Sequence, residues 1–541
     1  MEKAKSLPQR VSGEPLESWK EIGSYLNRDV RTVERWERTK GLPVHRLPGG
    51  GTARVYAFKP ELDAWRSGRG LPSQEAALSP ALLPSIAVLP FVNLGADREN
   101  EYFSDGLAED IINALAKLPG LRIVARTSSF AFRGKSATAA EIAAKLKVAT
   151  ILEGSVRKAG TRIRVTAQLI KAADQSHLWE DWYDRELTDV FAIQDEISQA
   201  IVEKLRVRLA GDHPLVRRYT ESTEAYQLYL KGRYCWNQKT EEGYKKGVQY
   251  FNQVIEKDPG FVLAYAGAAD CYSSLGVHSY LAPKDAYPQA KAAATKALKL
   301  DENLAEAHTS LAAVAFRYDW NWQEAEKGFR HAIALNPNYW FAHIFYGYYL
   351  ACMGRFEESL LECNRARELE PLSLHVNACL GLCCYFGREY EQAAKELTTT
   401  LEMDPSSAVA HCYLGLTYLQ KQTLGDAIAR FQRAVVLEGD NPVYIANLGI
   451  AYARAGKSSE ASTILGDLQT LSKRRYVSPV WPALVLAYIG GKKDEAVEAL
   501  ERGFEDRFEF MHSLKVNPAF DPFRFDPRFQ ALLRRMKFPE K

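Results

Sequence analysis

Long hydrophobic runs are rare in this 541-residue sequence. Residues 1–10 contain no apolar core of the kind found in signal peptides. The most apolar stretch, residues 76–94, contains Pro80, Pro84 and Pro90 and falls short of the ~20 mainly apolar residues that a membrane-spanning helix needs. We therefore expect a cytoplasmic protein with no membrane partner.

The cysteines of this chain do not form the patterns that bind metals or build dense disulfide scaffolds. The 8 cysteines all lie at or after Cys235, and none belongs to a CxxC pair. Secreted disulfide scaffolds are short and rich in cysteine, so this usage is typical of a reduced, intracellular chain. Because an unpaired cysteine behaves mainly as a small apolar side chain, we expect these thiols to pack in the interior and to bind no metal.

Catalytic motifs are absent as well. The chain has no GxxxxGK phosphate loop, no GxSxG turn, no HExxH motif and no set of kinase or nucleotidyl-cyclase motifs. Asp105, Glu109 and Asp110 could bind a cation, but we favour the solvated first turn of a helix. His177, beside Trp179, has no nucleophile or second acid nearby, so we favour packing over catalysis. We expect no enzyme activity, no catalytic residue and no cofactor.

Net charge is small, because 70 Lys and Arg stand against 67 Asp and Glu and give +3. The distribution is uneven. Residues 1–72 hold 14 basic and 9 acidic side chains and carry +5, which leaves −2 for the rest of the chain. A small basic segment therefore precedes a long, slightly acidic body, and such local basic charge is typical of a contact with nucleic acid.

A pattern with a period of 34 residues dominates the C-terminal part of the chain. Pro337, Pro371 and Pro405 are spaced by that period, each after an acidic residue or asparagine. Proline ends a helix because it cannot extend the hydrogen-bond ladder. Small residues recur where a first helix would meet a second one; these are Gly347, Gly381, Gly415 and Gly449. The pattern resembles the tetratricopeptide repeat (TPR) family and implies about eight helix pairs.

Residues 85–210 alternate between strand and helix patterns. Residues 85–91 and 120–124 are short apolar runs that predict buried strands, and residues 150–157 with 162–170 predict a hairpin. Three helices are expected: one capped by Ser104, one over residues 139–146 and one with isoleucine or leucine at every fourth position from Ile193 to Leu209.

This order of elements resembles the amino-terminal domain of TolB and its relatives. The matching segments are residues 87–91 (AVLPF), 101–106 (EYFSDG), 152–157 (LEGSVR) and 177–179 (HLW). The resemblance implies the fold of a small α/β domain that precedes a TPR array in bacterial regulators. It supplies no catalytic residue.

The basic segment contains the pattern of two short helices. Ser18 and Glu21 form a capping-box pattern at the start of the first helix, and Asp29 can cap a second helix over residues 30–40. Residues 44–47 and 53–56 flank a proline-glycine turn and predict a β-hairpin. A third helix is expected from Pro60 to Trp65.

This arrangement resembles the MerR/excisionase class of winged helix-turn-helix domains, through residues 30–33 (VRTV), 35–37 (RWE), 41–43 (GLP) and 54–56 (RVY). The resemblance implies that the second helix enters the major groove while the hairpin follows the DNA backbone. The implied DNA-binding residues are Arg28, Arg31, Thr32, Arg35, Arg38, Arg46 and Arg54. The arginine fork suits guanine edges and phosphates. Glu34 and Glu37 weaken the local positive field, and the long MerR dimerisation helix is absent.

The inner face of a TPR superhelix is its usual partner groove. Here that face is expected to be apolar and to bind a protein or peptide segment. The alternative is that the curvature of the array or a neighbouring domain covers it. The expected groove residues are Ile344, Phe345, Tyr348, Leu382, Tyr413 and Leu416.

Together these patterns predict a multidomain, mostly α-helical protein. A winged helix-turn-helix is followed by a small α/β domain and then by an α-solenoid of TPR helix pairs. The expected boundaries are a flexible tail at 1–15, the DNA-binding domain at 16–70, a linker at 71–84, the TolB-like domain at 85–210 and the TPR superhelix at 223–541.

The sequence favours a bacterial transcriptional regulator that binds DNA through residues 16–70 and a protein or peptide through the TPR array. The TolB-like domain would be a sensing or interaction module. The alternatives are a non-enzymatic TPR scaffold or adaptor and an accessory subunit of a separately encoded enzyme. The sequence does not identify the operator, the TPR partner, a small ligand, the oligomeric state, or whether the regulator activates or represses.

Overall fold

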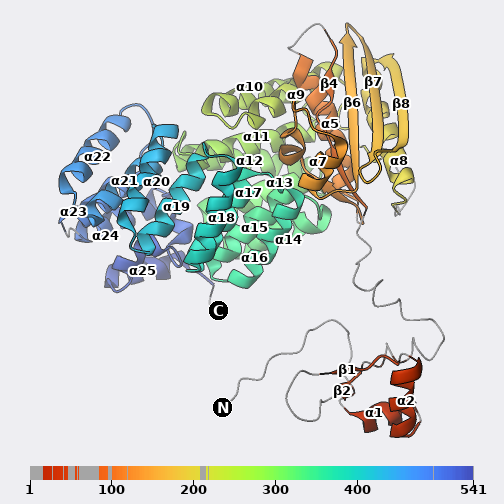
Figure 1. Ribbon diagram of the computed structural model, residues 1–541. Helices are drawn as coiled ribbons and strands as arrows, with labels where there is room; N and C mark the ends of the chain where they lie inside the picture. Colours follow the sequence, from red (N-terminus) through yellow and green to blue (C-terminus); the bar gives the residue numbers. More distant parts are fainter. Residues whose placement is uncertain are drawn as a thin grey trace. The chain divides into compact units, whose positions relative to one another are not determined.

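The computed structural model describes residues 16, 18–26, 28–40, 42–46, 55–57, 59, 62, 84–95, 100–118, 120–207, 215–216, 218–490 and 493–539. The chain divides into two compact units, Met1–Leu83 and Pro84–Lys541. Each unit is described separately below (Figure 1).

The first unit contains two helices and a two-stranded antiparallel hairpin. Its elements are α1 (Trp19–Leu26), α2 (Val30–Lys40), β1 (His45–Arg46) and β2 (Val55–Tyr56). The Ser18 hydroxyl accepts a hydrogen bond from the Glu21 amide at 3.2 Å, as the capping-box pattern predicts for the start of α1. The buried core consists of Ile22, Leu26, Val33, Leu42, Ala57 and Leu62. Of the expected third helix, only Leu62 lies within the described residues, and it belongs to this core.

The second unit begins with an α/β domain built on a mixed sheet. Its strands are β3 (Ser85–Val88), β4 (Val92–Asn93), β5 (Arg122–Val124), β6 (Thr150–Ala159), β7 (Arg162–Lys171) and β8 (His177–Glu186). The order is β5-β3-β6-β7-β8, and β4 pairs with β6. The pairs β3–β5 and β3–β6 are parallel, whereas β6–β7 and β7–β8 are antiparallel. The predicted hairpin is therefore correct, but it is extended by β8, which the sequence analysis missed.

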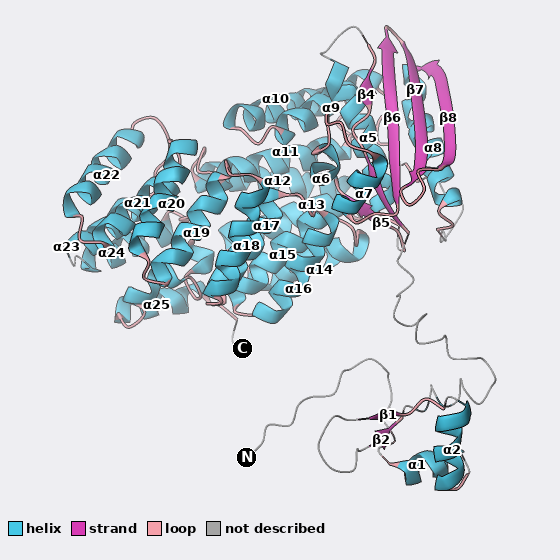
Figure 2. Ribbon diagram, viewed as in Figure 1, coloured by secondary structure: helices cyan, strands magenta, loops and turns pink. Residues whose placement is uncertain are grey.

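Helices cover both faces of this sheet (Figure 2). They are α5 (Glu101–Ala116), α6 (Arg126–Phe130), α7 (Ala139–Leu146) and α8 (Val190–Lys204). Alternating residues of β3 point to opposite sides: Ile86 packs in the same cluster as α5 and α8, and Ala87 packs with α7. The prediction that Ser104 caps a helix is wrong, because α5 begins three residues earlier and Ser104 is buried within it.

Eight antiparallel helix pairs follow in the described part of the second unit (Figures 1 and 2). The first four pairs are α9 (Thr223–Asn237) with α10 (Glu241–Lys257), α11 (Val262–Val277) with α12 (Pro283–Leu300), α13 (Ala305–Val314) with α14 (Trp322–Leu335), and α15 (Trp340–Met353) with α16 (Phe356–Leu369). The other four are α17 (Leu374–Phe386) with α18 (Tyr390–Met403), α19 (Ala408–Gln420) with α20 (Leu424–Leu437), α21 (Pro442–Arg454) with α22 (Ser458–Leu471), and α23 (Val480–Gly490) with α24 (Lys493–Glu505).

Glycine and proline act in the repeat as the sequence predicts. The helices α14, α16 and α18 each end two residues before a repeat proline. A Cβ atom at Gly347 would lie 2.5 Å from Cys363 Sγ, and one at Gly415 would lie 2.8 Å from the Phe431 ring. The first helix of a pair can therefore approach the second only where it has no side chain. Seven of the 8 cysteines are buried without a disulfide, as expected, and Cys379 is half-buried.

The chain continues past the last pair into a segment that the repeat pattern does not predict. It contains the short 3-10 helices η4 (Met511–Ser513) and η5 (Pro518–Phe523) and the helix α25 (Pro527–Met536). Phe520 and Phe529 are buried in the same core as the repeat helices. In the described residues, no helix is both long and apolar enough to cross a bilayer.

Candidate functional site

The turn between α1 and α2 is the first candidate site, in the unit Met1–Leu83. Asp29 caps α2, since its carboxylate accepts hydrogen bonds from the Thr32 amide at 2.9 Å and from the Thr32 hydroxyl at 2.7 Å. These bonds lower the pKa of Asp29, the hydroxyl of Thr32 contributing most. The Thr32 hydroxyl is thus part of the cap, and a DNA contact by Thr32 would compete with it.

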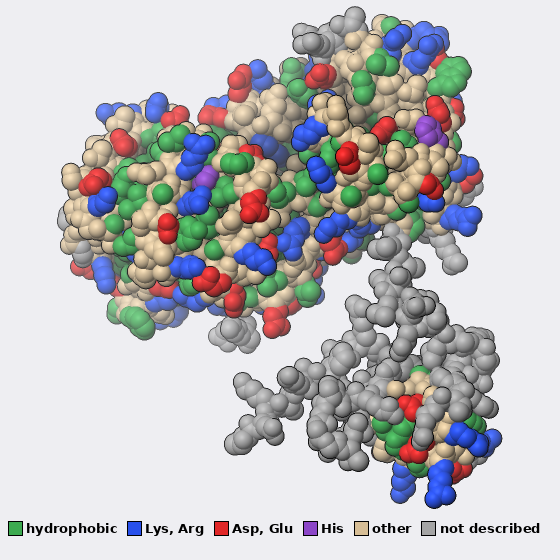
Figure 3. Space-filling view, viewed as in Figure 1, with side chains coloured by type: hydrophobic (Ala, Val, Ile, Leu, Met, Phe, Trp, Pro, Cys, Tyr) green, Lys and Arg blue, Asp and Glu red, His purple; other side chains and the backbone are tan. Residues whose placement is uncertain are grey.

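Three of the predicted DNA-binding arginines are exposed in this unit: Arg28 at the turn, and Arg31 and Arg35 on α2. The Arg28 guanidinium lies 5.9 Å from the centre of the Trp36 ring, which holds it beside the helix. Lys and Arg side chains are visible on the surface of this unit in Figure 3. Arg38 belongs to α2 and Arg46 to β1, but their side chains lie outside the described residues, as does the whole of Arg54.

Gly23 is a structural requirement of this turn that the sequence analysis missed. A Cβ atom at Gly23 would lie 2.8 Å from the carbonyl oxygen of Arg28. The amide of Arg28 donates a hydrogen bond to the Gly23 carbonyl at 2.9 Å, which closes the turn. The available signal was a glycine three residues before the end of a short helix, followed by a capping residue.

The predicted partner groove is largely filled by the chain itself. Ile344, Tyr348 and Leu382 are buried, with at most 6% of each side chain exposed. The Tyr348 hydroxyl is hydrogen-bonded to His512 Nε2 at 3.0 Å, so the segment that contains η4 covers this part of the face. The open apolar groove predicted at these three residues is therefore wrong, and the alternative that this face is covered holds for them, with the C-terminal segment as the cover at Tyr348.

The other three groove residues, Phe345, Tyr413 and Leu416, are half-buried and pack against the same core. Tyr413 and Leu416 line a cavity of about 50 Å³, together with Phe510 and Phe520 from the C-terminal segment. Phe345 lines a different and larger cavity of about 420 Å³. On the face drawn in Figure 3, apolar side chains gather over the repeat helices among charged ones.

The acidic residues of α5 form neither a cation site nor a solvated first turn, which were the two interpretations of the sequence. Asp105 and Glu109 are buried, and both carboxylates form ion pairs with arginines. Arg126 Nε lies 2.9 Å from Glu109 Oε2, and Arg233 Nη2 lies 2.7 Å from Glu109 Oε1. Arg133 pairs with Asp105. The expected solvated helix N-terminus is therefore wrong, since α5 begins before these residues and turns them toward arginines.

These ion pairs join the α/β domain to the first repeat, because Arg233 belongs to α9. Burial would raise the pKa of Glu109, but the charges of Arg233 and Arg126 hold it below its ordinary value. For Asp105, burial outweighs Arg133 and raises the pKa. In the described residues, no group of three or more His, Cys, Asp or Glu side chains could hold a metal ion.

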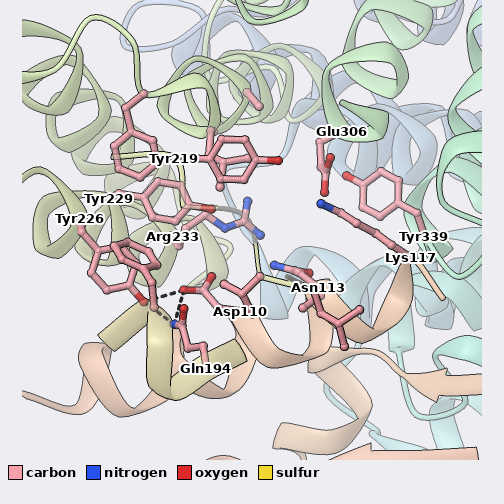
Figure 4. A pocket seen from close by; sticks show the side chains of 18 of the residues that line it. Asp110, Asn113, Lys117, Gln194, Tyr219, Tyr226, Tyr229, Arg233, Glu306 and Tyr339 are labelled. Atoms are coloured by element: carbon pink, nitrogen blue, oxygen red, sulfur yellow. Dashed lines mark hydrogen bonds between the residues drawn. The ribbon is translucent and has the colours of Figure 1, made fainter. Parts of the chain in front are cut away.

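A pocket of about 90 Å³ lies beside these pairs, between α5, α8 and α9 (Figure 4). Asp110 Oδ2 accepts hydrogen bonds from the Tyr226 hydroxyl at 2.6 Å and from Gln194 Nε2 at 2.9 Å. Burial and the neighbouring Glu109 raise the pKa of Asp110 to about 7. These hydrogen bonds connect α5 and α8 of the α/β domain to α9 of the first repeat.

His177 does not pack in the interior, contrary to expectation. Its side chain is 52% exposed on β8, and Nδ1 lies 3.5 Å from Glu180 Oε2. His177 is the first residue of β8, where the pairing with β7 shifts register, and the strand itself was not predicted.

Comparisons with known proteins identify the repeat. Residues 385–442 match the family model of the tetratricopeptide repeat. The chain is 37% identical over 287 residues to "Putative adenylate cyclase 3" of Rhizobium meliloti (strain 1021), which covers 52% of this chain and 46% of that protein. It is 26% identical over 150 residues to "Transcriptional regulator HilA" of Salmonella typhimurium, which covers 28% of this chain and 27% of that protein.

Among solved structures, yeast Tom70 matches with a TM-score of 0.38 and 17% identity, over 60% of this chain and 69% of that chain. The chain spans less than half the length of the two curated relatives. The match to the family model and the eight helix pairs show a TPR-like solenoid, and an α/β region precedes it. A solenoid of this kind is a scaffold for protein or peptide partners.

Proposed function

We propose that the protein is a transcriptional regulator that binds DNA through a winged helix-turn-helix at residues 16–70. The observation that carries the proposal is the polarity of α2. Arg31 and Arg35 are exposed and stand four residues apart, while Val33 between them is fully buried. Two guanidinium groups therefore project from the side of α2 that faces away from the core.

The major groove of DNA admits one α-helix, so a single helix such as α2 can enter it. A capped helix whose exposed side bears arginine can read guanine edges or grip phosphates, and a hairpin beside it can follow the backbone. The similarity to the Salmonella regulator agrees with a regulatory role. The TPR solenoid and the TolB-like domain would then receive the signal or partner that controls the regulator.

Fluorescence anisotropy of the full chain with DNA from upstream of its own gene tests the proposal. We expect binding at low salt that weakens as salt rises, because phosphate contacts release counterions. The variant Arg31→Ala/Arg35→Ala should bind at least about tenfold more weakly, since each good arginine contact contributes about 1–3 kcal/mol. The matched control is Arg162→Ala/Arg164→Ala, which removes the same charge from two exposed positions on β7.

Two results would overturn DNA binding by α2: no binding at low salt, or equal affinities for the α2 double variant and its control. Circular dichroism and a thermal melt of both variants separate loss of contact from loss of folding. The predicted DNA contacts of Arg28, Arg38, Arg46 and Arg54 can be tested by single alanine substitutions in the same assay.

The second candidate is a scaffold or accessory subunit of a separately encoded enzyme. It is favoured by the similarity to the Rhizobium protein, which is stronger than the similarity to the Salmonella regulator. Capture of a cyclase or another enzyme by the immobilised full chain, in the absence of DNA binding, would support it. A Phe345→Asp variant that captures partners as well as the native chain would exclude the predicted groove as the contact.

A further inference from the structure

A cavity of about 420 Å³, large enough for a small molecule, lies on the concave side of the solenoid. Its walls come from the helices α9 to α13, from η3 (Ala315–Asp319), from α15 and from the start of α17 with the loop before it, and Thr127 and Ala131 line it from the α/β domain. We call this space the hollow. Much of its lining is aromatic: Trp236, Tyr244, Tyr287, Trp340, Phe341 and Phe345.

Two cations stand in this aromatic wall. Lys239 Nζ lies 3.3 Å from the centre of the Trp236 ring, and the Arg317 guanidinium lies 5.5 Å from that of Phe345. Within the described residues, neither cation has a carboxylate inside the 4.0 Å limit of a salt bridge. They rest on ring faces, which attract cations but leave their charge unneutralised.

The only carboxylate among the described lining residues is Asp270, and other groups already engage it. Asp270 Oδ1 accepts a hydrogen bond from the Ser310 hydroxyl at 2.8 Å, and Arg233 lies 3.6 Å from Oδ2. Desolvation by the surrounding protein walls lowers the pKa of His278 to about 4 and that of His375 to about 3, although both side chains are exposed to the hollow, so both imidazoles are neutral at pH 7. The hollow therefore holds two basic side chains without a paired carboxylate, beside neutral hydrogen-bonding groups.

The backbone is irregular at both cations, and the larger irregularity is at Arg317. The helix α13 passes into the π-helical turn η3, which includes Arg317, and ends at Trp320 in the left-handed region with φ of 55°. No other repeat helix in the described residues has a π-helical turn. Such turns occur often at functional sites. Lys239 is left-handed as well, with φ of 57°, directly after α9.

The remaining concave surface does not continue the hollow as a peptide groove. On one side, α6 of the α/β domain is fixed by hydrogen bonds of Thr127 and Ser128 to the Glu370 carboxylate. On the other side, the bond between Tyr348 and His512 places the C-terminal segment against the array. An extended peptide needs a continuous groove, whereas a compact ligand does not.

We propose that the hollow binds a small organic anion with an aromatic or alkyl body. The anionic group would lie between Lys239 and Arg317, and the apolar body would pack against the rings of α15. A carboxylate and a phosphate monoester share this chemistry, and competition between the two resolves which head group fits.

Fluorescence titration of the full chain with anilinonaphthalene sulfonate tests the site, since this probe is anionic and aromatic. The neutral N-phenylnaphthylamine has almost the same rings without the sulfonate. We expect saturable binding of the anionic probe at one site per chain and at least about tenfold weaker binding of the neutral probe, the loss expected for a charge-assisted contact. Dodecanoate or dodecyl phosphate should displace the anionic probe, and dodecanol should not.

Two variants assign the binding to the hollow. Lys239→Gln removes one cation, and His375→Trp fills the space from an exposed position without a change of charge at pH 7. Each should weaken binding about tenfold or more. The matched control is Lys246→Gln, because Lys246 is an exposed lysine on α10 paired with Glu242 and lies outside the hollow. Thermal melts show whether each variant is folded.

The proposal is overturned if the charged and neutral probes bind equally, or if both hollow variants bind the anionic probe like the control while remaining folded. It is also overturned if acidic peptides displace the probe and the small anions do not, since the site would then be a peptide groove. None of these outcomes depends on whether residues 16–70 bind DNA.

Discussion

Glu370 and Ser128 join two parts of the molecule that are 242 residues apart in sequence. The Glu370 carboxylate is fully buried and accepts hydrogen bonds from the Ser128 hydroxyl at 2.5 Å and from the Ser128 amide at 2.7 Å. The same hydroxyl accepts a hydrogen bond from the Leu372 amide at 2.9 Å. Glu370 directly precedes a repeat proline, so a position that ends a helix in the other repeats also holds the α/β domain here.

A Glu370→Gln substitution should destabilise the second unit. Glutamine keeps one acceptor oxygen but turns an N–H₂ group toward the amide of Ser128, which leaves buried donors facing each other. The expected loss is about 2–4 kcal/mol in the free energy of unfolding. Urea denaturation measures it, with Glu368→Gln as the control because Glu368 lies two residues away and its side chain is 61% exposed. Equal midpoints for the two variants would contradict the role of this contact.

Asp110 should make stability depend on pH between about 4 and 7. Burial, with a contribution from Glu109, raises its pKa from 3.8 to about 7, so the folded state favours the protonated form. Its contribution to stability is complete below pH 3.8 and is lost as the pH rises through 7. Asp110→Asn keeps an acceptor oxygen for Tyr226 and Gln194 but has no proton to lose, so it stays uncharged as the pH rises.

This variant should be more stable than the native chain at pH 8, by about 1–3 kcal/mol, and nearly equal to it at pH 4. Thermal melts across this range measure the difference. Glu203→Gln is the control, because Glu203 is exposed near the end of α8. A native-minus-variant difference that does not change with pH would show that Asp110 is ionised throughout.

Gly415 should tolerate no side chain. A Cβ atom there would lie 2.8 Å from the fully buried Phe431 ring, so Gly415→Val forces α19 and α20 apart. Overpacking of this kind costs about 1–3 kcal/mol. Gly425→Ala is the matched control, since a Cβ atom at Gly425 meets nothing within 4 Å and alanine favours the helix. Chemical denaturation should separate the two variants in opposite directions from the native chain.

The parts of this structure that were predictable arise from local chemistry. A helix cannot continue through Pro371, and a first helix cannot approach Cys363 unless position 347 lacks a side chain, so proline and glycine spacing determined the repeat. The hairpin β6–β7 was predictable from its turn and from the alternation of apolar and polar residues between Arg162 and Leu169 on the return strand. Asp29 was likewise predictable as the cap of α2, because it stands three residues before Thr32, whose amide it accepts a hydrogen bond from.

The parts that were missed depend on residues far apart in sequence. Glu109 reads as a solvated acid until Arg233, 124 residues later, is brought beside it. Tyr348 reads as a groove residue until His512 covers it. Burial of a polar or aromatic side chain is set by which distant segment packs there, and no local period encodes that choice. The hollow could not be predicted for the same reason, since its walls come from five repeats and the α/β domain.

The proposed ligand site makes a prediction about pH through Lys239. Its side chain is exposed to the hollow but surrounded by protein walls, and burial together with Arg233 lowers its pKa to about 7. An anion in the hollow favours the protonated amine, so binding above pH 7 must take up a proton. Affinity for the anionic probe should therefore fall as the pH rises from 7 to 9, approaching about tenfold per unit.

The loss of affinity caused by deprotonation of Lys239 can be distinguished from the titration of its charged neighbours. The charged groups that act on its pKa are Arg233, Asp270, Arg126 and Glu109. Only Asp270 among them titrates close to neutrality, because burial raises its pKa to about 6. Lys239→Gln should therefore abolish the loss of affinity between pH 7 and 9 and retain the smaller change around pH 6. Isothermal titration in two buffers of different ionisation enthalpy measures the proton uptake directly. An uptake at pH 8 that is the same in the native chain and in Lys239→Gln would show that another group binds the proton.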